Sequence, residues 1–287
     1  MKKLFLLICF LIIKSTLYAV YFKHIGMQEG LSQVSVMSIY QDQLGRMWFG
    51  THEGISLYDG GRMKIYKEWG KEKREEKINI LLGHPCDFIV GNKNGDVFFR
   101  TSESMLKYDI RNETFRVVSD HTHTITSYNG EVWAAYGNTI YKYDEDKDSL
   151  CVYLKTDLPK ISCLLITNDE IWVGTYEGLY VIDGQKETHC RLADTDIYRL
   201  FESSSKEIWV GTSSDGLHRL TAEGKSIHYS SNKSSPHPIA TNQIREFVED
   251  SSGKIWFGTF LGLYCYNPYT DMFTFYQQDD LPGSLSH

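Results

Sequence analysis

Short segments in which apolar and polar residues alternate recur along the chain. A well-defined set lies near the start, where VMSIYQD (36–42), RMWFGT (46–51), GISLYD (54–59) and RMKIYKE (62–68) follow one another. An alternation of period two is typical of β-strands with one buried face, and the Gly residues between segments suit tight antiparallel turns. No amphipathic helical pattern interrupts these segments. The pattern predicts an all-β chain built from antiparallel hairpins.

An aromatic residue marks the second segment of each set. The aromatic is Trp in five sets and Phe in one, at successive spacings of 50, 35, 39, 37 and 47 residues. In the best-preserved sets Gly-Thr, two variable residues and a Gly follow. Four short antiparallel strands in about 42 residues are typical of a β-propeller blade. The marker residues are Trp48, Phe98, Trp133, Trp172, Trp209 and Trp256.

The repeat itself has a structural explanation. The marker aromatic fills the space between neighbouring blades, the Gly after it allows two sheets to approach closely, and Thr and the next Gly end the strand and reverse it. We therefore expect Trp48, Trp172, Trp209 and Trp256 to be buried. The two longest spacings contain unpatterned polar stretches, WGKEKREEK (69–77) and SSNKSSPHP (230–238). Long loops of this kind are where binding function tends to be located.

The two ends of the repeat region resemble each other. Residues 21–33 and 273–287 each contain an aromatic strand, an acidic turn and Leu-Ser. An outer strand before the first unit is what a circular propeller uses to close its last blade. We predict six complete four-stranded repeats and the start of a seventh, which is an incomplete seven-bladed propeller over residues 20–287, truncated at the C-terminus.

The first nineteen residues predict export. Lys2 and Lys3 precede an apolar run over 4–13, and Ala19 offers a small residue for cleavage. We interpret residues 1–19 as a signal peptide, with an uncleaved anchor as the alternative. The whole chain, with 41% hydrophobic and 14% aromatic residues, suits a globular, strand-rich fold.

Charge and cysteine content exclude several classes of partner. The formal charge of −7 becomes −10 without the three lysines of the leader, so nucleic acid and anionic membrane surfaces are poor partners. The basic run KEKREEK (71–77) includes acids of its own and is interpreted as a solvated loop. Five cysteines remain, without CxxC spacing, so we predict small core residues, one pair of which could be bridged, and no zinc site.

Motifs for catalysis are missing from the sequence. It contains no GxSxG, HExxH, P-loop or GxGxxG, so we assign no catalytic residue, cofactor or metal. The histidines of HTHT (121–124) could share a metal if they lay on one strand, although two loop histidines are the favoured interpretation.

A binding site is better predicted by position. The variable pair inside each GTxxG turn and the starts of the units lie on one face of a propeller, where the scaffold fixes the loops and leaves the side chains free to vary. The alternatives are exposed turn residues without a ligand, and a ligand held between two propellers. The candidate ligand-binding residues are His52, Glu53, Tyr136, Tyr176, Glu177, Tyr198, Arg199, Asp215, Arg245 and Phe260.

Two stretches carry a family resemblance. VMSIYQDQLGRMWFGTHEGISLYDG (36–60) and IREFVEDSSGKIWFGTFLGLYCYNP (244–268) resemble the two-component regulator propeller repeat of periplasmic sensors in bacterial hybrid two-component systems, especially those of gut Bacteroidetes. The resemblance covers nearly the whole mature chain, although the second and third units are degenerate.

The resemblance implies a specific function. In such sensors two seven-bladed propellers and an immunoglobulin-like domain precede a transmembrane helix and a histidine kinase, and the ligand is an oligosaccharide. It implies that this chain is the N-terminal portion of the first propeller of an inner-membrane-anchored dimeric sensor, whose kinase activity belongs to downstream domains. The alternatives are a propeller lyase of the streptogramin-lyase type and a nonfunctional fragment of a split sensor gene.

Overall fold

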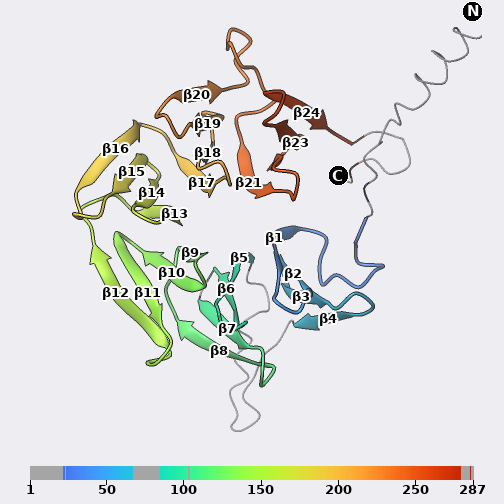
Figure 1. Cartoon of the computed structure of the whole chain (residues 1–287). Helices are drawn as coiled ribbons and strands as arrows, with labels where there is room; N and C mark the ends of the chain where they lie inside the picture. Colours follow the sequence, from blue (N-terminus) through green and yellow to red (C-terminus); the bar gives the residue numbers. More distant parts are fainter. Residues whose placement is uncertain (1–21, 23, 67–84, 103, 279–284, 286–287) are drawn as a thin grey trace, which may run out of the picture.

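Six four-stranded antiparallel sheets form a ring (Figure 1). The computed structural model describes residues 22, 24–66, 85–102, 104–278 and 285. In every sheet the strands lie side by side in chain order, with the first strand near the centre of the ring and the fourth at its rim. The predicted β-propeller is confirmed, and each of the six predicted repeats forms one blade.

The blades are numbered in chain order. Blades 1 to 3 consist of β1 (Val36–Gln41), β2 (Met47–Thr51), β3 (Gly54–Tyr58) and β4 (Met63–Tyr66); β5 (Cys86–Gly91), β6 (Val97–Thr101), β7 (Met105–Asp109) and β8 (Thr114–Ser119); and β9 (Thr124–Tyr128), β10 (Glu131–Tyr136), β11 (Thr139–Asp144) and β12 (Ser149–Lys155). Blades 4 to 6 consist of β13 (Ile161–Ile166), β14 (Ile171–Thr175), β15 (Gly178–Ile182) and β16 (Thr188–Ala193); β17 (Ile197–Glu202), β18 (Ile208–Thr212), β19 (Leu217–Leu220) and β20 (Ser226–Tyr229); and β21 (Ile244–Glu249), β22 (Ile255–Thr259), β23 (Gly262–Asn267) and β24 (Met272–Tyr276).

Some predicted features fall outside the described residues. These are the signal peptide at 1–19, the basic run at 71–77 and most of the start of a seventh unit. The described N-terminal segment reaches the last blade, because the Phe22 ring lies edge-on to Tyr276 of β24, with centroids 5.7 Å apart. Within the described ranges, no helix is long and apolar enough to cross a membrane. The five described cysteines are free thiols, and Cys86, Cys163 and Cys265 are buried as predicted.

The marker tryptophan of blade 1 is held by a bond to the preceding turn. Trp48 is fully buried, and its indole Nε1 donates to Oδ2 of Asp42 over 2.9 Å. The same carboxylate accepts from the backbone and the guanidinium of Arg46. Burial alone would raise the pKa of Asp42, but the bonds from Trp48 and Arg46 outweigh it and lower the pKa. Trp256 and Asp250 repeat the indole–carboxylate bond in blade 6, at 2.8 Å.

Apolar clusters fill the junctions between successive blades. Five clusters lie between blades 1 and 2, 2 and 3, 3 and 4, 4 and 5, and 5 and 6. Among the described residues no such cluster joins blade 6 to blade 1. The predicted burial of Trp256 is therefore wrong: it is partly exposed, because it lies on the uncovered side of blade 6. Val248 on that side and Ile39 on the facing side of blade 1 are each 59% exposed.

The glycine after the marker tryptophan lies against the next blade. A Cβ added at Gly50 would be 2.3 Å from the Cys86 carbonyl oxygen, and one at Gly211 would be 3.0 Å from Ile244 Cγ2. A Cβ added at Gly258, the matching residue of blade 6, would meet no described atom within 4 Å. The predicted structural reason for the glycine is therefore correct at the filled junctions.

This difference predicts that the same substitution changes the free energy of unfolding unequally at the two glycines. Gly50→Ala should lower the free energy of unfolding by about 2 kcal/mol, because the new methyl group would overpack against backbone that cannot move aside. Gly258→Ala should change it by less than about 0.5 kcal/mol, because the site is open. Urea unfolding followed by tryptophan fluorescence measures both. Similar losses in the two variants would contradict this account of blade packing.

Candidate ligand-binding site

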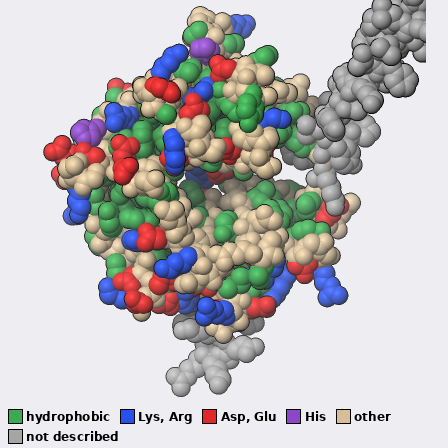
Figure 2. Space-filling model, in the orientation of Figure 1, with side chains coloured by type: hydrophobic (Ala, Val, Ile, Leu, Met, Phe, Trp, Pro, Cys, Tyr) green, Lys and Arg blue, Asp and Glu red, His purple; other side chains and the backbone are tan. Residues whose placement is uncertain are grey.

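The strand register places the candidate residues on one face of the ring. In blade 1, Val36 at the start of β1 pairs with Thr51 at the end of β2, and Thr51 pairs with Gly54 at the start of β3. The other blades repeat this arrangement, so the GTxxG turns and the starts of the inner strands share one edge of each sheet. We call this side of the ring the GTxxG face. Figure 2 shows the ring hollowed at its centre, with basic and acidic side chains at the edge of the hollow.

A β-bulge turns one residue of the inner strand in five blades. The register shifts at the second residue of β1, β5, β13, β17 and β21. Bulges re-aim side chains, and they are common next to functional sites. The bulged residues are Met37, Asp87, Ser162, Tyr198 and Arg245. Sequence reasoning placed Tyr198 and Arg245 in the site but did not find the bulge that brings them together.

Five side chains form an alternating stack at the centre of this face. The guanidinium carbon of Arg245 lies 4.1 Å from the ring centroid of Phe260 and 4.6 Å from that of Tyr198. The guanidinium carbon of Arg199 lies 4.9 Å from the ring centroid of Tyr198 and 4.0 Å from that of Phe88. We call Phe260, Arg245, Tyr198, Arg199 and Phe88 the arginine–aromatic ladder. It connects blades 6, 5 and 2 across the ring.

The two arginines of the ladder differ in their environment. Arg199 is only 8% exposed, and its Nε donates to Oε2 of Glu246 over 2.9 Å. A second nitrogen of Arg199 donates to the backbone oxygen of Asp87 at 3.4 Å. Its donors are thus directed to blades 6 and 2, and it braces the ring. Within the described residues Arg245 has no carboxylate partner, and its buried Nε has no hydrogen-bond partner.

Two further candidates, Tyr136 and Tyr176, lie on blades 3 and 4. The ring of Tyr136 contacts His121 and His123, at centroid distances of 5.3 and 4.7 Å. Nδ1 of His123 accepts a hydrogen bond from the backbone of Gly137 over 3.1 Å. Both histidines lie in the loop before β9 and pack on the tyrosine, in agreement with the favoured loop interpretation of HTHT. Tyr176 of the next blade lies under Lys160, whose Nζ is 5.9 Å from the ring centroid.

The remaining candidates lie apart from these groups. His52 and Glu53 occupy the exposed β2–β3 turn of blade 1, and Glu177 lies in the exposed β14–β15 turn of blade 4. Asp215 is directed toward the outer strands of its own blade, where its Oδ2 lies 2.9 Å from Nε2 of His218. The structure therefore assembles about half of the predicted residues into the ladder and the Tyr136 group.

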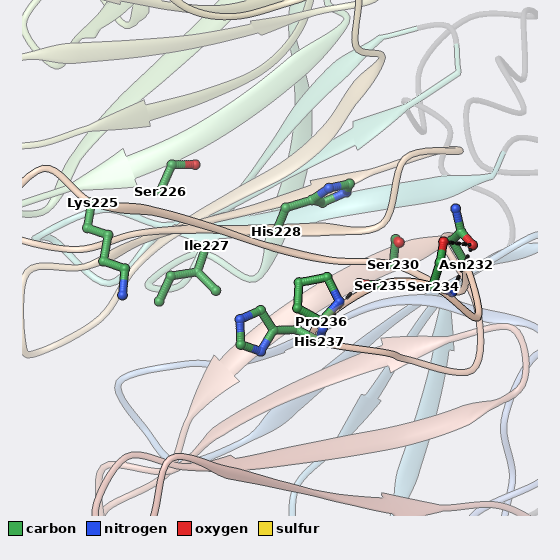
Figure 3. A pocket seen from close by; sticks show the side chains of 10 residues that line it. All are labelled: Lys225, Ser226, Ile227, His228, Ser230, Asn232, Ser234, Ser235, Pro236 and His237. Atoms are coloured by element: carbon green, nitrogen blue, oxygen red, sulfur yellow. Dashed lines mark hydrogen bonds between the residues drawn. The ribbon is translucent and has the colours of Figure 1, made fainter.

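A separate hollow lies at the rim of blade 5 (Figure 3). Its volume is about 460 Å³, and it lies between β20 and the loop that follows, 230–237. Lys225, just before β20, and Ile227 of β20 point to the same side as Pro236 and His237 of the loop, whereas Ser226 and His228 point to the other side. None of the predicted ligand-binding residues lines it. The only sequence signal for it was the long polar stretch SSNKSSPHP.

Comparison with known families identifies the repeat. Residues 30–53 and 238–260 match the family model described as two component regulator propeller. These segments contain the first two strands and the marker tryptophans of blades 1 and 6. The chain carries the two-component regulator propeller repeat in blades 1 and 6. This repeat is the one that the sequence resembles at 36–60 and 244–268.

The proteins that this chain resembles are longer than the chain itself. A stretch of 46 residues is 46% identical to histidine kinase P4 of Formosa agariphila, covering 16% of this chain and 3% of that kinase. The extracellular domain of a hybrid two-component system from B. thetaiotaomicron has a TM-score of 0.76 at 21% identity, over 93% of this chain and 38% of that one. A second such domain from the same organism has a TM-score of 0.72 at 20% identity, over 93% and 36%. The chain thus spans well under half of these proteins.

A lyase shares the fold more distantly. Catalytically inactive virginiamycin B lyase from Staphylococcus aureus has a TM-score of 0.62 at 13% identity, over 85% of this chain and 84% of the lyase. At these identities the structural similarities establish the β-propeller fold alone.

The half-buried His123, which packs on Tyr136, should make the free energy of unfolding depend on pH. Burial, together with the charges of Lys160 and Arg100, lowers the pKa of His123 from 6.5 to about 4. As the pH falls from 6.5 towards 4, the unfolded chain takes up a proton that the folded chain does not. The contribution of His123 is therefore complete above pH 6.5 and is lost as the pH falls through this range.

His123→Asn provides the matched test, because its amide oxygen can accept the bond from Gly137 but does not titrate. Urea unfolding at pH 7 and pH 5 should show a smaller loss of stability in this variant than in the native chain. An equal loss in the two proteins would contradict the assignment.

Proposed function

We propose that this propeller is an exported, periplasmic sensor region of a two-component system, and that it binds an oligosaccharide on the GTxxG face. The matching family model, the short stretch shared with a histidine kinase and the similarity to extracellular domains of hybrid systems support this proposal. The observation that carries it is the arginine–aromatic ladder at the centre of the face.

The ladder has the chemistry of a saccharide site. Sugar rings bind proteins by placing their C–H faces on aromatic rings, while fixed polar groups orient the hydroxyls. Phe260 is 63% exposed and offers its free surface beside the Arg245 guanidinium. Arg245 lacks a carboxylate partner among the described residues, so a carboxylate- or sulfate-bearing sugar would complete its charge pairing. The proposed ligand is therefore an acidic oligosaccharide in preference to a neutral one.

The ladder also suggests how binding would be transmitted. A ligand that contacts Phe260 and Tyr198 would bind blades 6 and 5 together, and Arg199 connects Tyr198 to blade 2. Such a ligand would favour one packing of these blades over another, provided that its affinity for the two differs. In the proposed full-length sensor, which is dimeric and anchored in the inner membrane, this shift would act on a kinase through the domains next to the propeller.

A lyase is the weaker alternative. Among the described residues, the histidine–carboxylate contacts within hydrogen-bond distance are His218 with Asp215 and His189 with Asp183. The two histidines lie on β19 and β16, the carboxylates lie in the turns before these strands, and none of the four residues belongs to the ladder. A remnant without function would bind no sugar at all, so the binding experiment below addresses that alternative as well.

Substitutions in blade 6 test the proposed ligand site. In calorimetric titrations with a panel of neutral and acidic oligosaccharides, Phe260→Ala and Arg245→Ala should each weaken binding about tenfold, because each removes a stacking face or a charge worth roughly 1–2 kcal/mol. Tyr269→Ala is the matched control, since Tyr269 is an 82% exposed aromatic of the same blade in the β23–β24 turn, at the opposite edge of the sheet.

The rim hollow provides the competing location. His237→Ala should leave binding unchanged. Binding that is lost in His237→Ala and retained in Phe260→Ala would place the ligand in the rim hollow and overturn the ladder as the site. Absence of binding to every sugar in the panel would contradict the proposed ligand class.

A further inference from the structure

Blade 5 departs from the repeat at three positions that lie together. Its β18–β19 turn, GTSSDG (211–216), has one residue more than the GTxxG turns, and Asp215 belongs to this longer turn. His218 of β19 and His228 of β20 are directly opposite each other in the sheet. The equivalent pairs in the other blades contain no histidine: they are Ser56–Ile65, Leu106–Val117, Tyr141–Val152, Tyr180–Cys190 and Tyr264–Phe275.

The three side chains converge on a small volume. The two imidazole rings are parallel within 6°, with centroids 4.2 Å apart. Nε2 of His218 lies 2.9 Å from Oδ2 of Asp215, and Nε2 of His228 lies 3.6 Å from Oδ1 of the same carboxylate. One ligand atom from each residue falls within 4.8 Å of the other two. Two imidazole nitrogens and a carboxylate oxygen thus point to the same place.

We propose that Asp215, His218 and His228 form a binding site for a divalent transition-metal ion, with Zn²⁺ as the ion of choice. Imidazole nitrogen with carboxylate oxygen is a ligand set that zinc and its neighbours prefer, whereas Ca²⁺ and Mg²⁺ prefer oxygen alone. Ligand atoms about 2.0–2.2 Å from a tetrahedral ion are roughly 3.3–3.6 Å apart. Because the two rings are parallel, they would have to tilt toward one another for both nitrogen lone pairs to reach one ion. His228 would also have to release the Asp215 backbone oxygen, which its Nε2 contacts at 2.5 Å. Three protein ligands leave a fourth position for water.

Burial and access are both suitable for such an ion. The side chain of His218 is 9% exposed, so this ligand is shielded from bulk solvent. The side chain of His228 is 41% exposed, which leaves a path from solvent. A bound ion would join the longer turn on the GTxxG face to the two outer strands of blade 5. The proposal does not depend on the sugar site, because no residue of the ladder takes part.

The neighbouring blade supplies a matched control. Asp183, Glu187 and His189 of blade 4 also lie close together, but this group has a single histidine, and Glu187 and His189 are exposed. A surface group of this kind is expected to bind metal weakly. His189→Ala therefore removes one histidine from a similar β-sheet position without touching the proposed site.

Metal titration of the whole chain is the decisive experiment. After treatment with a chelator, calorimetric titration with Zn²⁺ should show one site per chain, and Zn²⁺ should raise the melting temperature. His228→Ala should weaken Zn²⁺ binding at least about tenfold and abolish the thermal shift, as expected for loss of a direct ligand. His189→Ala should retain both.

Variants and a second probe separate metal binding from folding. His228 is partly exposed, so the metal-free His228→Ala chain should melt near the metal-free native chain, and Asp215→Asn should repeat its binding defect. Co²⁺ added to the native chain should give the visible absorption of a tetrahedral site containing nitrogen ligands. Zn²⁺ binding that is absent from the native chain, equal in His228→Ala, or lost in His189→Ala instead would overturn the proposal.

Discussion

The close approach of one blade to the next is the constraint on which this structure depends. At a filled junction the glycine after the marker tryptophan lies against the first strand of the following blade, as Gly50 lies against Cys86. Any side chain at that position would push the sheets apart and open the apolar cluster between them. The tryptophan two positions before this glycine is held by a hydrogen bond from its indole to the carboxylate of the preceding turn, which is Asp42 in blade 1. Spacing, burial and turn geometry are thus coupled in blade 1.

The sequence pattern was sufficient to predict the fold because it records this coupling. The period-two alternation identified the strands, and the spacing of the marker aromatics identified the blades even where the second unit carries Phe98 in place of Trp. The pattern could not predict the exposure of Trp256, because burial depends on what lies on the far side of a blade. The same motif is core at a filled junction and surface at an open one.

The candidate site was only partly predictable for a related reason. Position within the repeat indicated the correct face, and it named Tyr198, Arg245 and Phe260, which do meet. It could not indicate which candidates face one another across the ring, since Phe88 and Arg199 are 111 positions apart in the chain. Nor could it indicate that Arg199 is directed to Glu246 and the backbone of blade 2. Contacts across the centre depend on how successive blades curve around it, which no local pattern records.

A repeated scaffold makes departures from its own pattern informative. Positions that recur in each blade serve packing, so a residue that occurs in one blade alone needs another explanation. The ladder arises where the bulged starts of inner strands carry large polar and aromatic side chains in neighbouring blades. The His218–His228 pair occupies a cross-strand position that holds no histidine in the other blades. In both places the backbone keeps the blade geometry while the side chains change chemistry. Function in this propeller is therefore expected at such departures, with the repeated four-stranded frame and its marker aromatics holding them in place.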